Sequence, residues 1–164
     1  MKTLLLFAIL LLPACSLTAQ TPLKEGPTVN GVRLGATQNE VRARFGKPLS
    51  QERREAEPCV GGTELTMRYR GAVITLWDDP SDRSRFTVGR IEVTSAAWPV
   101  SGVRVGQSSG TVRARFGKPD AQEPDQRTKL SVWYYEMTDD SPGNTHFTFR
   151  NGKLTKITAI FLMC

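Results

Sequence analysis

The sequence has few of the residues that catalytic and metal sites use most often. It holds one histidine, His146, and three cysteines in 164 residues. A single histidine excludes the usual multi-histidine zinc site, and nothing near His146 in the sequence suggests a catalytic triad. The acid pairs at 78–79 and 139–140 lack the alternating oxygen ligands of a calcium loop and are typical of solvated turns. We therefore expect no enzyme activity, no cofactor and no metal.

Long apolar runs are also scarce, and the one present lies at the start of the chain. Met1 and Lys2 precede an apolar stretch over 3–12, which is too short to span a bilayer and indicates an export signal. Two cleavage sites compete. Leu-Pro-Ala-Cys over 12–15 resembles a lipobox, which predicts a lipoprotein signal over 1–14 and an acyl anchor on Cys15. Cleavage after Ala19 instead predicts a signal peptide over 1–19.

The two cleavage sites predict different locations for an exported protein. Lipidation at Cys15 predicts an outer-membrane lipoprotein facing the periplasm, whereas cleavage after Ala19 predicts a soluble periplasmic or secreted protein. Either event leaves two cysteines, Cys59 and Cys164. In an oxidising compartment they indicate one disulfide, contributing about 4 kcal/mol by closing a long loop. The alternative is a pair of buried free thiols.

Acidic residues are fewer than basic ones, which bears on the partners. Twenty-two lysines and arginines face 16 acidic residues, and removing Lys2 with the signal leaves 21. The surplus favours anionic neighbours such as lipid headgroups, envelope polymers or acidic proteins, although it also suits a purely solubilising role. No nucleic-acid motif is present, so we expect no nucleic-acid partner, and we expect a monomer.

A repeated octapeptide organises the rest of the chain. Val-Arg-Ala-Arg-Phe-Gly-Lys-Pro stands at 41–48 and again at 112–119, and the match extends upstream, where 31–35 aligns with 102–106. Self-similarity at a fixed offset indicates duplicated structural units. Each copy is small and would bury too little surface alone, so we expect the copies to pack together. The predicted division is a linker over 20–30, repeat 1 over 31–101 and repeat 2 over 102–164.

A short helix should open each repeat. Thr37 and Glu40 form a capping box, and Phe45 lies one helical turn after Val41 on the same face. Gly46 then provides a left-handed stop. The second helix can use Ser108 as its cap but lacks the glutamate. Helices this short need a packing surface, so the phenylalanines should press on a sheet.

Strand patterns follow each helix. Alternating or apolar segments predict three strands per repeat, at 63–69, 72–77 and 88–96, and at 128–134, 145–150 and 154–162. Asn-Gly at 151–152 predicts a tight hairpin, and 51–57 favours a short helical turn. The predicted fold class is α+β. Two helix-plus-three-stranded-meander repeats would form one antiparallel sheet of about six strands, with short helices on one face.

These residues also carry a resemblance to known families. The pattern formed by Gly35, Thr37, Val41 and 45–48 resembles the SmpA/OmlA (BamE-like) domain, here in tandem. The duplication is similar to the beta-lactamase inhibitor protein (BLIP-like) architecture. The first resemblance implies a small outer-membrane lipoprotein that assists outer-membrane protein assembly and contacts anionic phospholipid. The second implies a protein that blocks an exported enzyme with the open face of its sheet. The matching residues are cap, core and stop residues, so no binding residue transfers.

Strand parity predicts a binding surface on the face of the sheet away from the helices. If Val132 and Tyr134 point inward, the residues pointing outward mix aromatic groups with arginine, a composition typical of interface hot spots. The predicted partner-binding residues are Arg68, Arg70, Trp133, Tyr135, His146 and Arg150. The alternative is that a loop or the other repeat covers Trp133 and Tyr135. The sequence thus predicts a non-enzymatic cell-envelope binding or scaffold protein, with a secreted inhibitor of an exported hydrolase as the alternative.

Overall fold

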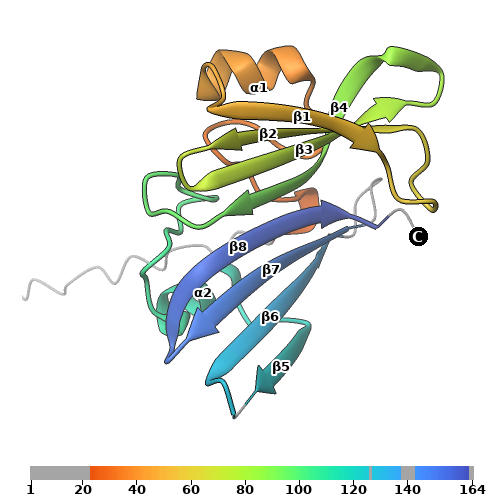
Figure 1. Ribbon diagram of the computed structural model, residues 1–164. Coiled ribbons are helices and arrows are strands. Elements are labelled where there is room, and N and C mark those ends of the chain that lie inside the picture. Colours follow the sequence, from red (N-terminus) through yellow and green to blue (C-terminus); the bar gives the residue numbers. More distant parts are fainter. Residues whose placement is uncertain (1–22, 126, 138–142, 163–164) are drawn as a thin grey trace, which may run out of the picture.

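The computed structural model describes residues 23–125, 127–137 and 143–162. The predicted export signal with Cys15, the acid pair at 139–140 and the predicted disulfide partner Cys164 lie outside this part of the chain. The described residues form one antiparallel sheet of eight strands in the order β1-β2-β3-β4-β8-β7-β6-β5 (Figure 1). The strands are β1 (Ser50–Glu55), β2 (Thr63–Tyr69), β3 (Ala72–Asp79), β4 (Asp82–Val93), β5 (Ala121–Asp125), β6 (Leu130–Met137), β7 (Gly143–Arg150) and β8 (Lys153–Phe161).

The strand order divides the sheet into two halves. The first half is the meander β1 to β4 and the second is the meander β5 to β8. They meet where β4 pairs with β8, with Arg90 opposite Ile160 and Val93 opposite Ile157. A helix precedes each meander, α1 (Gln38–Phe45) and α2 (Ser109–Phe116), and a short 3-10 helix, η1 (Leu23–Glu25), comes before both.

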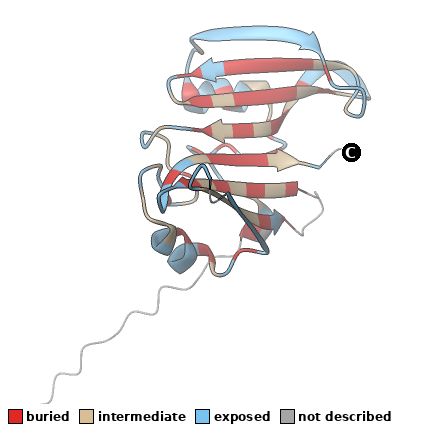
Figure 2. Cartoon of the chain, turned by 60° about the horizontal axis from the view of Figure 1, so that its bottom comes forward, coloured by how far each residue is buried: buried red, intermediate tan, exposed pale blue. Residues whose placement is uncertain are grey.

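The fold class predicted from the sequence is wrong. The described chain is predominantly β, with eight strands rather than six, and its two α-helices have only eight residues each. The segment expected as a helical turn at 51–57 is mostly β1, and β5 has no counterpart among the expected strands. Both are edge strands exposed along their whole length, as Figure 2 shows for β1. Hydrogen bonding to a neighbouring strand overrides weak helix propensity at such an edge.

The helix starts and stops are confirmed. Thr37 and Glu40 form the capping box, Ser108 caps α2 without a glutamate partner, and a glycine with positive φ follows each helix. Phe45 and Phe116 are buried. The Phe45 ring centroid lies 5.1 Å from that of Tyr69, and the Phe116 ring lies 5.4 Å from that of Phe147. Both helices therefore press on the same face of the sheet.

The fold begins earlier than the sequence suggested. Leu23 and Val29, placed in the predicted linker, are 5% and 1% exposed. Val29 forms a tight turn with Val32 through two backbone hydrogen bonds of 2.8 and 2.9 Å. Cys59 lies in the connection between β1 and β2, and its disulfide to Cys164 stays a prediction. No helix in the described ranges is both long and apolar enough to cross a membrane.

Candidate binding surface

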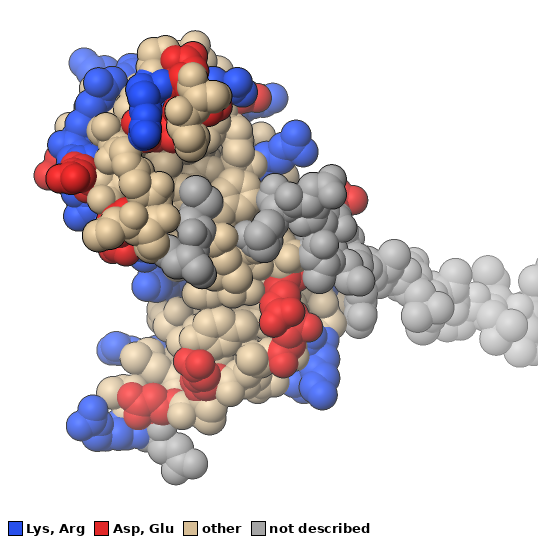
Figure 3. Space-filling view, turned by 90° about the vertical axis from the view of Figure 1, so that its right-hand side faces the viewer, with Lys and Arg blue, Asp and Glu red and all other residues tan. Residues whose placement is uncertain are grey.

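The face of the sheet opposite the two helices, called here the open face, is the candidate binding surface. In β2, Leu65, Met67 and Tyr69 are buried on the helix side, and Arg68 between them is exposed on the other side. Neither α1 nor α2 covers the open face. The edge-on view in Figure 3 shows this side of the molecule, at the left, hollowed between an upper and a lower lobe that both carry charged residues. The surface is therefore concave.

A groove crosses the first half of the open face. It has a volume of about 320 Å³ and extends from β1 to β8, so it spans the junction of the two halves. Its apolar lining comes from the connection between β1 and β2, from β3 and from β8, through Val60, Val73, Trp77, Ile160 and Phe161. An indole, a phenyl ring and aliphatic groups in one concave site offer a contact area that favours a partner.

The position of Trp77 depends on a glycine in the next strand. Gly89 stands at an irregularity where β4 has one residue more than β3, because Val88 pairs with Leu76 and Arg90 pairs with Thr75. A Cβ atom at Gly89 would overlap the Trp77 ring. The glycine therefore lets the indole lie directly on the β4 backbone.

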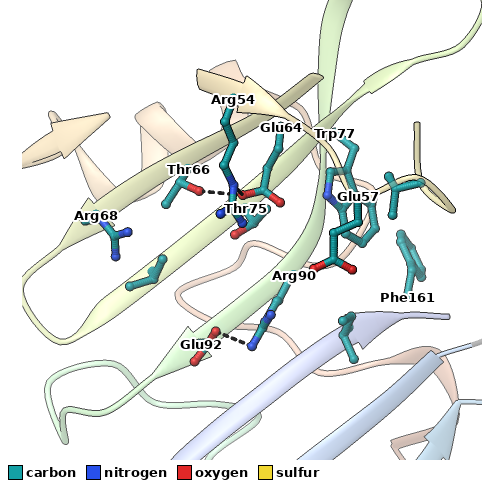
Figure 4. A pocket seen from close by; sticks show the side chains of 13 residues that line it. Arg54, Glu57, Glu64, Thr66, Arg68, Thr75, Trp77, Arg90, Glu92 and Phe161 are labelled. Carbon is teal, nitrogen blue, oxygen red and sulfur yellow. Dashed lines mark hydrogen bonds and ion pairs between the residues drawn. The ribbon is translucent and has the colours of Figure 1, made fainter. Parts of the chain in front are cut away.

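Two ion pairs border the groove. Arg54 Nε donates to Glu64 Oε1 at 2.8 Å, and Arg90 Nη2 lies 2.6 Å from Glu92 Oε1. Figure 4 shows these pairs on opposite sides of the groove, with Trp77 toward one end and Arg68 toward the other. No hydrogen bond or ion pair joins the Arg68 side chain to another residue of the described ranges. Its guanidinium is available to an acidic group on a partner.

The open face continues into the second half through Tyr134 and His146. These residues face each other across β6 and β7, with ring centroids 4.6 Å apart, and the Tyr134 hydroxyl donates to Glu123 Oε2 at 2.6 Å. Burial lowers the pKa of His146, and the positive charges of Arg90 and Lys156 lower it further. The neutral imidazole is therefore favoured in the folded protein.

Three polar side chains near the junction of the two halves each have one buried nitrogen or oxygen atom without a hydrogen-bond partner. Arg90 Nε, Asn144 Oδ1 and His146 Nε2 have no partner in the described part of the chain. They come from β4, β7 and β7, and Ile160 of β8 pairs with both Arg90 and Asn144. An unpaired buried polar atom costs about 1 to 3 kcal/mol. A bound partner that shifts these side chains and pairs them would recover part of that free energy.

The structure separates the six predicted partner-binding residues into two groups. Arg68 and His146 lie on the open face, Arg150 is exposed at the end of β7, and Arg70 is exposed in the turn after β2. The Arg70 carbonyl accepts a hydrogen bond of 2.8 Å from the Trp98 indole. The remaining two, Trp133 and Tyr135, lie on the helix side.

The outward orientation predicted for Trp133 and Tyr135 is wrong, because the predicted alternation of inward and outward residues is shifted by one residue. Tyr135 is 4% exposed, and Trp133 packs on Phe149 with ring centroids 4.7 Å apart. The Tyr69 hydroxyl donates to the carbonyl of Gly46, and the Tyr135 hydroxyl donates to that of Gly117. Tyr69 therefore corresponds to Tyr135, whereas the strands expected at 63–69 and 128–134 match Tyr69 with Tyr134. A one-residue slip moves every side chain of a strand to the other face.

Sequence reasoning missed the groove residues Val73, Trp77 and Arg90 and the second-half residue Tyr134. Trp77 was expected at the end of a strand. Its contact with Gly89 depends on the irregularity in β4, and the only sign of that irregularity in the sequence is the glycine. Tyr134 was assigned inward because the strand expected at 128–134 was matched to 63–69 one residue out of step, which put Tyr134 in the place of Tyr69. In the described part of the chain no group of three or more His, Cys, Asp or Glu side chains is placed to hold a metal ion.

Comparisons with known proteins give three distant structural likenesses. No family matches the sequence, and neither does any curated protein. A DUF4309 family protein from Bacillus subtilis is 12% identical with a TM-score of 0.42, and 77% of this chain and 79% of that chain are covered. An extracellular protein with an SCP domain from Bacillus anthracis is 14% identical with a TM-score of 0.47, covering 77% of this chain and 43% of that chain.

The third likeness is to a Streptococcus mutans protein provisionally described as a beta-lactamase inhibitor protein. It is 17% identical with a TM-score of 0.31, and 76% of this chain and 82% of that chain are covered. The BamE-like resemblance finds no counterpart among these comparisons. These identities and TM-scores are too low for any of the three proteins to indicate the function of this chain. A function is therefore inferred from the open face alone.

Proposed function

We propose that this chain is a non-enzymatic, exported binding protein that holds a protein partner on the open face of its sheet. One observation carries the proposal: both α-helices cover the same face, which leaves the opposite concave face of eight strands with a groove across the junction of the halves. An aromatic side chain left partly exposed in a concave site and bordered by two ion pairs is typical of a contact surface rather than of a face that only contacts water.

The composition of the open face supports a protein as the partner. Trp77 and Tyr134 supply large rigid aromatic surfaces, and Arg68 supplies a planar group that binds carboxylates. Such residues are common among interface hot spots. Because the groove also has Glu64 and Glu92 fixed by arginine, it suits a polypeptide segment of mixed polarity better than a uniformly charged polymer.

We extend the proposal to a lipoprotein of the cell envelope on the basis of the predicted lipobox. Mass spectrometry of the mature protein tests this directly. An acyl mass on an N-terminal Cys15 supports the anchor, and a mature chain that starts after Ala19 contradicts it. The same spectrum reports whether Cys59 and Cys164 are oxidised.

A second candidate function is inhibition of an exported hydrolase, and the hollow of the open face favours it because a concave surface accepts a protruding loop. The two functions differ in their consequence for the partner. An inhibitor stops its enzyme at a stoichiometric ratio of the two proteins, whereas an envelope scaffold co-purifies with a partner whose activity continues.

A substitution within the groove tests the binding surface. Val73 lies half-buried in the groove between Arg68 and Glu92 on the neighbouring strands, and Val73→Arg would fill the site. The matched control is Ala43→Arg on the exposed side of α1. We expect the control to co-purify with the same envelope protein as the native chain, and Val73→Arg to reduce the yield at least about tenfold with a similar thermal midpoint. Equal yields from both variants contradict the proposal.

A further inference from the structure

The second half of the sheet has an aromatic pocket at a position where the first half is filled. The correspondence of the halves follows from shared hydrogen bonds. The carbonyl of Val88 accepts from the Gly35 amide, and the carbonyl of Leu154 accepts from the Gly106 amide, at 2.7 and 2.8 Å. The residues just before Val88 and Leu154 match as well. Thr87 forms a β-bridge with Thr37, and Lys153 forms the equivalent β-bridge with Ser108. One residue earlier, Phe86 therefore corresponds to Gly152.

A second replacement lies opposite the first. Because Tyr69 corresponds to Tyr135, Leu65 corresponds to Ser131 four residues earlier. Leu65 pairs with Leu76, and Ser131 pairs with Phe149. In the first half Leu65 is 0% and Phe86 6% exposed, so both fill the core. The second half has only a hydroxymethyl group and a hydrogen atom in these two places.

The result is a pocket of about 230 Å³ beside the start of α2. It is lined by Ser109, Gln122, Lys129, Ser131, Trp133, Phe149 and Gly152. Trp133 and Phe149 form its aromatic walls, with ring centroids 4.7 Å apart. A cavity of about 150 Å³ with apolar walls accepts benzene, so this pocket has room for a phenyl ring.

The charge at the pocket is positive. Lys129 lines it, and the Arg113 guanidinium carbon lies 5.4 Å from the centre of the Trp133 ring. No acidic side chain is among the lining residues, all of which belong to the described part of the chain. In the first half Arg53 lies over Phe86 in a similar way, at 5.0 Å. A cation beside an aromatic site favours a ring with a nearby negative charge.

We propose that this pocket binds an aromatic side chain of a partner polypeptide, next to an acidic residue, in the place that Phe86 occupies in the first half. The acidic group pairs with Lys129 or Arg113, and the ring stacks on Trp133. The pocket lies on the helix side of the sheet, so the contact is separate from the open face and does not depend on the proposed function.

The test uses the mature protein and short peptides as probes. The readout is the indole N–H resonance of Trp133, assigned by its loss in Trp133→Phe. Acetyl-Phe-Glu-amide should shift this resonance in a saturable manner while the Trp77 resonance on the open face stays in place. Acetyl-Phe-Lys-amide should bind at least about tenfold more weakly because its charge is reversed, and acetyl-Ala-Glu-amide should cause no saturable shift.

Two variants at one position give the control. Ser131→Leu restores the leucine of the first half and fills the pocket, so we expect it to weaken binding of acetyl-Phe-Glu-amide at least about tenfold while keeping or raising the thermal midpoint. Ser131→Ala leaves the pocket open and should bind as the native chain does. Both substitutions are small and lie at a half-buried position, so the variants should fold.

Three results would overturn the proposal. The first is unchanged binding by Ser131→Leu, which would place the peptide elsewhere. The second is a shift of Trp77 with no shift of Trp133. In the third, phenylacetate binds as tightly as acetyl-Phe-Glu-amide, which would show that the pocket takes a free small molecule rather than a polypeptide side chain.

Discussion

Val29 and Val100 pair in an antiparallel bridge that joins the two halves at equivalent points. Each valine opens a tight turn whose central residues have positive φ, Asn30–Gly31 in one half and Ser101–Gly102 in the other. The Ser101 amide donates to the carbonyl of Thr28, at 2.9 Å, and reinforces the bridge. The halves are therefore linked both at this pair of turns and along β4 and β8.

The bridge predicts energetic coupling between the two valines. Both are 1% exposed, so each substitution to alanine should destabilise the fold by about 2 kcal/mol. Because the residues are in contact, the double variant should deviate from additivity by at least about 0.5 kcal/mol in urea unfolding. The same measurement with Val29→Ala and Leu154→Ala serves as the comparison. Strict additivity for Val29 and Val100 would show that the two side chains do not stabilise each other across the bridge.

The two helix caps should differ in strength. The Thr37 hydroxyl accepts from the Glu40 amide and donates to the Glu40 carboxylate at 2.7 Å, and Glu40 Oε2 also accepts from the Thr37 amide. The Ser108 hydroxyl accepts from the Thr111 amide and shares a second bond only with the neutral Thr111 hydroxyl, at 3.0 Å. Thr37→Ala should therefore cost more than Ser108→Ala, with values of about 1 to 2 and about 1 kcal/mol in denaturant unfolding. Equal costs would contradict a contribution from the hydrogen bond between the Thr37 hydroxyl and the Glu40 carboxylate.

Tyr135 makes the stability of the fold sensitive to alkaline pH. Burial raises the pKa of Tyr135 to about 12, and its hydroxyl donates to the Gly117 carbonyl at 3.0 Å. An acid whose pKa is raised on folding stabilises the protein below its ordinary pKa of 10.0 and loses this contribution as the pH rises toward 12. Tyr135→Phe should cost about 1 kcal/mol at neutral pH and flatten the fall in stability above pH 10. A fall of the same size in both proteins would contradict this assignment.

His146 should act at the opposite end of the pH range. The pKa of His146 is lowered on folding by burial and by Arg90 and Lys156, while Glu123 raises it. The Tyr134 ring centroid lies 4.6 Å from that of His146. The folded state then binds the proton less readily than the unfolded chain, so stability falls as the pH drops through and below 6.5. In His146→Gln, thermal midpoints between pH 8 and pH 5 should fall less than in the native chain. An equal fall would assign the acid sensitivity to other groups.

The sequence was most informative where local chemistry decides the structure. The capping residue Thr37, the stop at Gly46, the buried Phe45 and the hairpin at Asn151–Gly152 were all predicted correctly, because each depends on a few neighbouring residues. β2 was predicted with its observed bounds because Leu65, Met67 and Tyr69 alternate with polar residues.

The errors arose where long-range pairing decides the structure. The sequence of segment 50–55 does not indicate a strand, because all six residues are polar. In the structure they are exposed, and pairing with β2 holds them in an extended conformation. The slip that turned Trp133 outward came from two adjacent tyrosines in β6, and only the contact of Tyr135 with Gly117 distinguishes them. The pocket at Ser131 was invisible for the same reason, because it depends on knowing which residues correspond in the two halves.

Photo-crosslinking in the producing cell tests the central claim most directly. Benzoylphenylalanine would be placed at Val73 or Thr148 on the open face and, as matched controls, at Ala43 or Ala114 on the exposed sides of the two helices. The account predicts a discrete adduct with the same envelope protein from Val73 and Thr148, and none with that protein from Ala43 or Ala114. Adducts from the helix positions alone would contradict the assignment of the open face as the binding surface.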